Sequence, residues 1–352
     1  MPSACPFHTC LALGGMALSL LFPRLASKLA PPPRAPPNPL QGGLRGCSPS
    51  YPPPPSLLAA LSGVLAGVAA TSLALRRSTA GGAKAGSSNA SGDAQLELDL
   101  LCDARSFAAL RACGRFRWAV SEETPARREL AAGGEYACSF DPLDGSSVIG
   151  PNFAVGGIYA VWAVGDSGTF VGRSGREVLA SVVAVYGSRT TAFVGVRGAT
   201  AATEYTLVDG EWKLTAPIVS LPHTPSHRTF AFGNLRATAD SRAYRRLLDF
   251  YLAERYTLRY TGGMVPDVMH ILSKSGGVFT NVSSPKARAK LRFLYEIAAV
   301  ALLVEVAGGA AVDEGGGAML DVVCDGDDMR VGGCIGSKSE VEVFKRECCG
   351  IK

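Results

Sequence analysis

Residues 140–147, FDPLDGSS, restrict the fold of this 352-residue chain more than any other stretch. Two carboxylates, Asp141 and Asp144, stand at the end of EYACSF, which is typical of a short strand. Like charges this close repel one another unless a cation lies between them. The glycine and the two serines that follow offer backbone N–H groups and hydroxyls that could hold phosphate oxygens. The stretch therefore predicts a site where a cation and a phosphate meet.

Further acids recur where other elements are expected to begin or end. Asp93 and Asp99 accompany an amphipathic helical pattern that starts near residue 93, and Glu122 and Glu123 follow the short strand RFRWAV. The predicted apolar face of that helix consists of Leu96, Leu100, Ala104, Phe107 and Leu110.

Oxygen ligands without His or Cys favour hard cations such as Mg²⁺ or Mn²⁺. A pair of such ions is a known device for transferring a phosphoryl group to water. The alternative is that each acid is only a helix cap or a solvated surface charge. DPLDGSS together with a Glu-Glu pair after a strand favours the metal site.

The charge distribution argues against a nucleic-acid partner. Residues 1–92 carry seven basic side chains and no acid, so the rest of the chain has 35 − 7 = 28 basic and 30 acidic residues, a net charge of −2. No basic-aromatic stripe occurs in that body. The ten cysteines include no CxxC pair, so we expect free thiols in a reducing compartment rather than a zinc site or a disulfide framework.

The N-terminal quarter is typical of a targeting leader. Residues 1–22 include an apolar stretch of signal-peptide length, and residues 23–55 are rich in Pro, Arg and Ser, as in a transit segment. This order predicts two-step import into a plastid, a chloroplast stroma in the simplest case. A single leader of another kind is the alternative.

Residues 56–75 could form either of two structures. They are long and apolar enough to span a bilayer, but they are rich in Ala, Gly and Ser. We favour a buried first helix of the folded domain, with no stable membrane span in the mature protein. Trp118 and Trp162 lie in predicted strands and are expected in the core. In the apolar helix LRFLYEIAAVALLVEVAGG, Glu296 requires a compensating cation if it is buried.

Several motifs together resemble one family. FDPLDGSS, GDAQLELD at 92–99, SEE at 121–123 and GNLRAT at 233–238 look like the sugar-bisphosphatase family. So do RYTGGMVPDV at 259–268, FTNVSSPKARAKLRFLYE at 279–296 and AGGAAVDEGGGAMLD at 307–321. TGGMVPDV and FTNV resemble the sedoheptulose-1,7-bisphosphatase branch more than the fructose-1,6-bisphosphatase branch.

The resemblance implies an α/β (α+β) fold, a layered αβαβα sandwich of two lobes. Residues 56–215 would form the lobe with the metal site, and residues 216–352 the lobe that binds the sugar and its distal phosphate. It also implies a homodimer, because in related enzymes the residue matching Arg259 reaches the neighbouring subunit's site.

The resemblance also assigns roles to individual residues. The implied metal ligands are Asp93, Asp99, Glu122, Glu123, Asp141, the Leu143 carbonyl, Asp144 and Glu296. Asp99 and Glu123 match acids that help deprotonate the attacking water and are the expected catalytic residues. The implied substrate-binding residues are Gly145, Ser146, Ser147, Asn234, Arg259, Tyr260 and Lys290.

The implied activity is Mg²⁺-dependent hydrolysis of the 1-phosphate of sedoheptulose 1,7-bisphosphate, a step of carbon fixation, with Mn²⁺ as a second cofactor candidate. The alternatives are a fructose-1,6-bisphosphatase, a dual-specificity enzyme, or an inactive regulatory relative. The chain departs from the family pattern in two places. Gly82 and Ser87 stand near the positions of the cysteine pair that forms a redox switch in plastid relatives, and Gly150 replaces a common acid.

Overall fold

Two mixed β-sheets and the helices packed on them form the described part of the chain. The computed structural model describes residue 40 and residues 52–79, 83–88, 94–165 and 167–351. The predicted segment 1–22, nearly all of segment 23–55, and Asp93 lie outside these residues. The helices are α1 (Pro55–Arg77), α2 (Glu97–Cys113), α3 (Arg242–Ala253), α4 (Met264–Ser273), α5 (Ala298–Val306) and α6 (Lys338–Phe344).

The larger sheet has eight strands in the order β10-β9-β8-β7-β6-β5-β3-β4. Only β3 and β5 run parallel; the other neighbours are antiparallel. Its strands are β3 (Phe116–Ser121), β4 (Arg128–Glu129), β5 (Tyr136–Asp144), β6 (Val155–Ala163), β7 (Val178–Tyr186), β8 (Thr190–Val196), β9 (Ala202–Val208) and β10 (Glu211–Val219). A separate two-stranded sheet consists of β1 (Lys84–Ser88) and β2 (Ala94–Leu96).

The smaller sheet has the order β12-β11-β13-β15-β14. Its strands are β11 (Thr229–Gly233), β12 (Thr257–Leu258), β13 (Val278–Asn281), β14 (Ala310–Asp313) and β15 (Gly333–Gly336). The strand β11 pairs in parallel with β12 and β13, whereas β15 is antiparallel to both of its neighbours.

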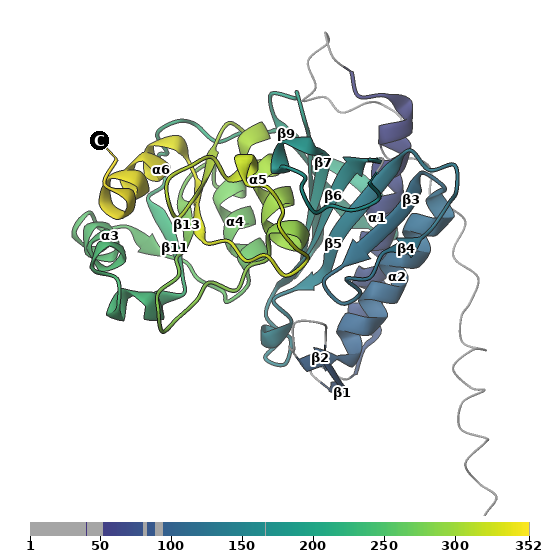
Figure 1. The fold of residues 1–352 in the computed structure, drawn as a ribbon, viewed down its shortest axis with the longest axis horizontal. Coiled ribbons are helices and arrows are strands. Elements are labelled where there is room, and N and C mark those ends of the chain that lie inside the picture. Colours follow the sequence, from purple (N-terminus) through teal and green to yellow (C-terminus); the bar gives the residue numbers. More distant parts are fainter. Residues whose placement is uncertain (1–39, 41–51, 80–82, 89–93, 166, 352) are drawn as a thin grey trace, which may run out of the picture. The chain divides into compact units, whose positions relative to one another are not determined.

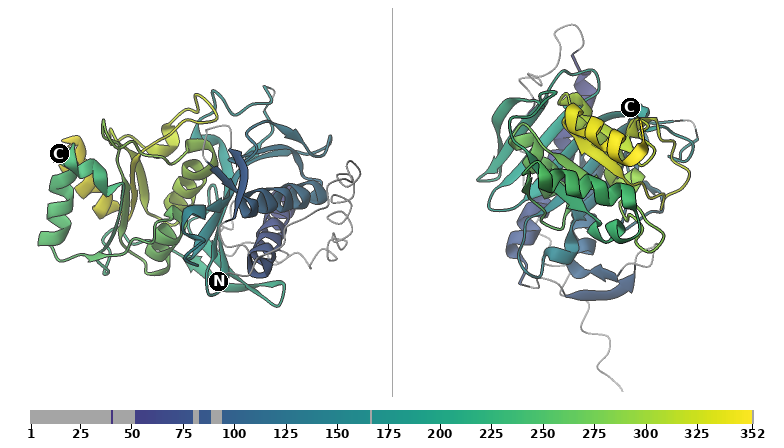
Figure 2. Two further views of the ribbon diagram at one scale, coloured as in Figure 1. Left: turned by 90° about the horizontal axis from the view of Figure 1, so that it is seen from below. Right: turned by 90° about the vertical axis from the view of Figure 1, so that its left-hand side faces the viewer.

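The elements form five layers, as predicted. The helices α1 and α2 cover one face of the larger sheet, and α4 and α5 fill the space between the two sheets. On the far face of the smaller sheet, α3 and α6 complete the stack, which Figure 1 shows from one side and Figure 2 from below. Because both faces of each sheet are covered, strands such as β5 and β8 are buried along their whole length. Trp118 and Trp162 lie in this core, also as predicted.

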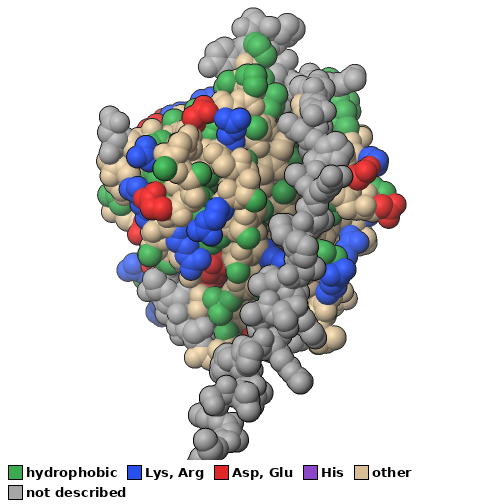
Figure 3. Space-filling view, turned by 90° about the vertical axis from the view of Figure 1, so that its right-hand side faces the viewer, with side chains coloured by type: hydrophobic (Ala, Val, Ile, Leu, Met, Phe, Trp, Pro, Cys, Tyr) green, Lys and Arg blue, Asp and Glu red, His purple; other side chains and the backbone are tan. Residues whose placement is uncertain are grey.

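The first helix, α1, packs against the rest of the folded protein. By length and hydropathy, α1 passes the test for a membrane span, but half of its most apolar window is buried inside the protein. Among its large apolar residues only Leu73 is exposed. The Leu65 carbonyl accepts a hydrogen bond from the Trp212 indole at 3.0 Å, and the Ser72 and Thr190 hydroxyls lie 2.6 Å apart. Figure 3 shows the face of the molecule at the right-hand side of Figure 1. Among the described residues on that face, apolar and charged side chains are interspersed.

The prediction for the second helix was wrong in its start and in its buried face. The helix α2 begins at Glu97, after the short strand β2, and Leu100 and Ala104 are exposed. Its buried side consists of Leu98, Asp99, Cys102, Asp103, Ser106, Phe107 and Leu110. A pattern based on apolar residues misses this face because three of its members are polar.

A bulge in β5 places its two aspartates on the same side of the strand. Asp141 pairs with Ile158 of β6, and Asp144 pairs with Gly156, so three steps along β5 match two along β6. In a regular strand, residues three apart point to opposite faces; one extra residue brings them back to the same face. Pro142 lies in this interval and has no N–H to give to the ladder, so it suits the bulge.

The N-terminus of α4 approaches the same point because β6 has a glycine there. A Cβ atom on Gly156 would lie 2.3 Å from Cβ of Val265, closer than any packed pair of atoms allows. With no side chain at Gly156, the first turn of α4 packs directly on the strand, and the Val265 N–H donates to Oδ2 of Asp144 at 2.8 Å.

We expect Gly156→Ala to push α4 away from the sheet. Overpacking of this kind costs about 1–3 kcal/mol of folding free energy, measurable by urea unfolding. Gly133→Ala is the matched control, because a Cβ atom there has nothing within 4 Å. Equal stability of the two variants would contradict the close approach of Val265 to this strand.

Candidate active site

One pocket of about 630 Å³ collects most of the predicted site residues. It is lined by Leu96, Asp99, Glu122, Glu123, Asp141, Leu143, Asp144, Gly145, Ser146, Ser147, Gly150, Lys290, Leu291, Arg292, Glu296 and Arg330. These residues come from β2 and α2, from the ends of β3 and β5 and the turns after them, from the segment that leads into α5, and from the loop before β15. The acids that the sequence spreads from residue 99 to residue 296 therefore meet at one place.

Three buried carboxylates form the centre of the site. Asp141, Asp144 and Glu296 each offer an oxygen within 4.8 Å of the other two. Burial raises the pKa of all three carboxyl groups, and the charge of neighbouring Glu122 raises them further. The pKa of Asp144 is raised to about 6. Ionising these buried acids is therefore unfavourable, and a cation bound between them would lower that free-energy cost.

Backbone N–H groups orient each member of this cluster. Oδ1 of Asp141 accepts from the Leu143 N–H at 2.8 Å, and Oδ2 of Asp144 accepts from Val265. Glu296 lies in the π-helical turn Phe293–Ile297 and accepts from the N–H of Arg292. One oxygen of each carboxylate is therefore fixed by the main chain, which leaves the other oxygen available for a ligand.

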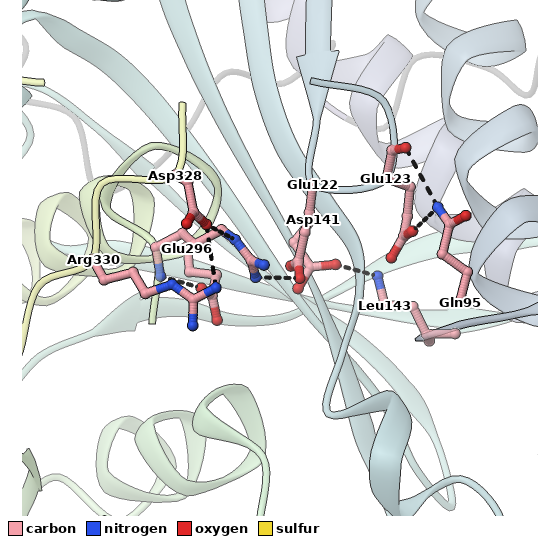
Figure 4. Close-up of polar contacts among 9 residues, drawn as sticks. Gln95, Glu122, Glu123, Asp141, Leu143, Glu296, Asp328 and Arg330 are labelled. Atoms are coloured by element: carbon pink, nitrogen blue, oxygen red, sulfur yellow. Dashed lines mark hydrogen bonds and ion pairs between the residues drawn. The ribbon is translucent and has the colours of Figure 1, made fainter. Parts of the chain in front are cut away.

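Asp99 and Glu123 lie at the edge of the pocket with raised pKa values. Desolvation raises the pKa of Asp99 to about 6 and that of Glu123 to about 7. Oδ2 of Asp99 accepts from the Leu96 N–H at 2.8 Å, whereas its buried Oδ1 has no partner in the described part of the chain. Glu123 accepts a hydrogen bond from the Gln95 amide (Figure 4).

Arg292 is a site residue that sequence reasoning missed. Its guanidinium is buried and donates to Glu122 at 2.5 Å and to Asp328 at 3.0 Å. Asp328 also accepts from Arg330 at 3.3 Å. Figure 4 shows Asp328, Arg330 and Glu296 on one side of Glu122 and Asp141, and Gln95 and Glu123 on the other. Arg292 stands four positions before Glu296, and this spacing within LRFLYE was the available signal.

Asp103 is the second residue that the sequence did not indicate. It is buried and accepts from the Ser121 hydroxyl at 2.5 Å and from the Thr124 hydroxyl at 2.9 Å. These two residues flank Glu122 and Glu123, so Asp103 fixes the turn that presents them. Asp103 follows Asp99 by one helical turn, so the two lie on the same side of α2.

The substrate residues expected from the resemblance fall into two groups. Gly145, Ser146, Ser147 and Lys290 line the pocket, and Gly145 takes the left-handed conformation that turns the chain after Asp144. Asn234, Arg259 and Tyr260 do not line it. The Asn234 amide donates to the Val282 and Ala287 carbonyls, each at 2.8 Å, so this side chain holds a loop. Roles for these residues in binding substrate stay predictions.

The donor set fits a hard divalent cation. Every acid at the centre offers oxygen, and the described residues that line the pocket include no His or Cys. Mg²⁺ and Mn²⁺ prefer carboxylate oxygens, and the orphaned Oδ1 of Asp99 is a further buried acceptor. Among the described lining residues, Arg292 has a buried guanidinium that pairs with Glu122, and its charge partly offsets the rise that burial causes in the pKa of Glu296.

Comparison with known families agrees with this site. Residues 56–217 match the model of the fructose-1-6-bisphosphatase N-terminal domain, and residues 223–348 match the C-terminal domain. The chain belongs to the fructose-1,6-bisphosphatase family. The resemblance inferred from the motifs is thereby confirmed, as is the fold class.

The relatives include both branches of the family. A chloroplastic sedoheptulose-1,7-bisphosphatase of Chlamydomonas reinhardtii is 44% identical over 268 residues, which are 74% of this chain and 66% of the relative. A class 1 fructose-1,6-bisphosphatase of Methylobacterium radiotolerans is 35% identical over 274 residues, 74% of this chain and 76% of the relative. The chain thus spans slightly less than two thirds of the Chlamydomonas protein.

Solved structures share the whole fold. A candidate sedoheptulose-1,7 bisphosphatase from Toxoplasma gondii matches with a TM-score of 0.80 and 33% identity, covering 88% of this chain and 99% of that one. The fructose-1,6-bisphosphatase of Leishmania major matches with a TM-score of 0.77 and 27% identity, covering 84% and 94%.

We expect the stability of the metal-free protein to fall as pH rises. The acids have higher pKa values in the folded chain than in the unfolded one, so folding takes up protons. The stability they contribute is fully present below about pH 4 and is lost as pH rises through about 6 to 7.

Added Mg²⁺ should reverse this trend, because it binds the ionised acids. A rise in Tm of about 5–10 °C is expected at about pH 8 with metal at about 100 times its Kd, and a much smaller rise at about pH 5.5. Glu296→Gln should reduce the Mg²⁺-induced rise. Differential scanning fluorimetry measures both effects, and equal shifts at the two pH values would contradict the assignment.

Proposed function

We propose that this chain is a Mg²⁺-dependent phosphatase that hydrolyses the 1-phosphate of sedoheptulose 1,7-bisphosphate to give sedoheptulose 7-phosphate. The observation that carries the proposal is the buried cluster of Asp141, Asp144 and Glu296 in a pocket that also holds serine hydroxyls and Lys290. Such a pocket suits a reaction in which cations and donors hold a phosphate while water attacks it.

The proposed metal ligands are Asp93, Asp99, Glu122, Glu123, Asp141, the Leu143 carbonyl, Asp144 and Glu296. When bound, Mg²⁺ supplies a Lewis acid that lowers the pKa of water and neutralises charge on the phosphate.

The chain's own groups position the reactants and move the proton. Asp99 and Glu123 line the pocket and are the proposed acceptors of the proton that the attacking water loses. Ser146 and Ser147, in the turn after Gly145, would donate to the reacting phosphate. Water attacks phosphorus and the bond to the sugar oxygen breaks, so no phosphoenzyme is expected.

The other end of the substrate needs separate recognition. Lys290 is exposed and lines the pocket, where its ammonium would attract phosphate as a point charge. Arg259 and Tyr260 are exposed directly after β12 and would bind the distal phosphate and the sugar. In a homodimer, Arg259 would reach the partner's site.

The proposed substrate preference rests on the relatives. Identity is 44% to the Chlamydomonas sedoheptulose-1,7-bisphosphatase and 35% to the Methylobacterium fructose-1,6-bisphosphatase. The Chlamydomonas protein is chloroplastic, which supports a plastid location and a place in carbon fixation for this chain.

Asp144→Asn should lower kcat by about 10³-fold or more, because it removes one negative charge from the centre of the site. The Asn carbonyl oxygen can still accept from Val265, so α4 should stay in place and the far-UV circular dichroism should not change. Asp249→Asn, on the exposed surface of α3, is the control and should leave kcat unchanged. Near-normal turnover of the Asp144 variant would contradict the metal-site assignment.

A substrate panel tests the reaction and its selectivity together. With Mg²⁺, phosphate release from sedoheptulose 1,7-bisphosphate should exceed release from fructose 1,6-bisphosphate by about tenfold or more in kcat/KM. Chelation should abolish both. A preference for the six-carbon sugar would assign the chain to the other branch. Absence of Mg²⁺-dependent release from either sugar would identify an inactive relative.

A further inference from the structure

Asp267 is a buried acid that takes no part in the pocket described above. It lies in the first turns of α4, is 2% exposed, and does not line the pocket. Its Oδ1 accepts a hydrogen bond from the Thr261 N–H at 2.9 Å, and its Oδ2 has no partner among the described residues. Burial raises the pKa of this carboxyl to about 7. A buried acid of this kind needs an explanation that packing alone does not give.

The carboxylate of Asp267 reaches outside its own helix. The N-cap of α4 is Gly263, which has no side chain, and the Val265 N–H of the first turn donates to Asp144. Instead of binding a free N–H of the first turn, Asp267 binds Thr261, two residues before the N-cap. It therefore ties the preceding segment, residues 259–263, to the helix. We call this segment the substrate arm, because it contains Arg259 and Tyr260.

The substrate arm has few other attachments. The Arg259 N–H donates to the Phe230 carbonyl at 2.9 Å, which fixes its first residue. Thr261 and Gly262 are exposed, and Gly262 has a φ of +99°, which an L side chain rarely adopts. Within the arm, the Thr261 hydroxyl donates to the Gly263 carbonyl at 3.3 Å and accepts from the Gly263 N–H at 3.4 Å, whereas the bond from the Thr261 N–H to Asp267 joins the arm to α4.

The end of the arm lies against the FDPLDGSS loop. A Cβ atom on Gly145 would lie 3.3 Å from Cα of Gly263, and one on Gly262 would lie 3.1 Å from a Val148 methyl carbon. Val265, two residues further on, donates to Asp144. A shift of the arm would therefore change the distance between Arg259 and the phosphate-binding loop.

We propose that Asp267 is a positioning residue, which holds the substrate arm at a set distance from the FDPLDGSS loop so that the arm recognises the distal end of the sugar bisphosphate. Asp267 touches neither metal nor substrate in this role; it acts through Thr261. The proposal rests on the proposed function and extends it to a residue that sequence reasoning did not single out as part of the site.

Asp267→Ala leaves the Thr261 N–H without its partner and frees the arm. We expect KM for sedoheptulose 1,7-bisphosphate to rise about tenfold or more, with kcat changed less than about threefold, because the metal site is untouched. Asp267→Asn keeps an acceptor oxygen at Oδ1 and should restore KM to within about threefold of wild type. The Mg²⁺-induced rise in Tm should be the same in all three proteins.

Other results would overturn the proposal. An unchanged KM in the alanine variant would contradict it. A loss of kcat together with an equal loss of the Mg²⁺-induced rise in Tm would also contradict it, because such losses indicate a general structural role. An asparagine variant as impaired as the alanine variant would show that acceptance from Thr261 is not the function. If the alanine variant does not fold, Asp267→Ser replaces it, because the serine hydroxyl keeps a polar atom at this position but ends one bond short of the carboxylate oxygen that accepts from Thr261.

A wild-type control separates this proposal from the proposed function. If the wild-type protein releases no phosphate, the proposed hydrolytic function is wrong. Binding of the two sugar bisphosphates can then be measured in each variant from the rise in Tm that they cause. A rise that is lost in the alanine variant and kept in the asparagine variant would still support the role of Asp267. A wild-type chain that neither hydrolyses nor binds either sugar overturns both proposals.

Discussion

The structure depends on carboxylates that are buried close together without equal positive charge. Asp141, Asp144 and Glu296 are each at most 6% exposed and lie within reach of a single ion. Burial of ionised acids is unfavourable, and mutual repulsion adds to it. Folding holds them there because their neighbours in each strand and helix are apolar and well packed. The energetic penalty is local, and a cation bound between these carboxylates would offset it.

The arrangement of layers explains how these acids meet. Asp99 comes from a helix on the outer face of the larger sheet, Asp141 and Asp144 from a central strand of that sheet, and Glu296 from the turn leading into α5 between the sheets. Asp144 also accepts from the first turn of α4, the helix that directly follows the segment carrying Arg259.

Prediction from sequence succeeded where a residue's role depends on its own neighbours in the chain. The strand ending near Ser121, the strand over EYACSF and the buried helix after Glu296 follow from apolar runs of the right length, although β5 continues past Asp141 to Asp144. Prediction was wrong for the face of α2, because Asp99, Asp103 and Ser106 are buried by contacts with distant strands. It missed Arg292 for the same reason, since the Glu122 carboxylate that pairs with it is 170 positions away.

The sequence by itself determined the chemistry of this protein: acids with glycine and serine after a strand imply a hard cation and a phosphate, whatever the fold around them. Only the tertiary structure decided which acids lie close together. The bulge at Pro142 turns Asp141 and Asp144 to the same side, and the missing side chain of Gly156 admits α4. These outcomes depend on pairing and packing between segments far apart in the chain, which no local pattern records.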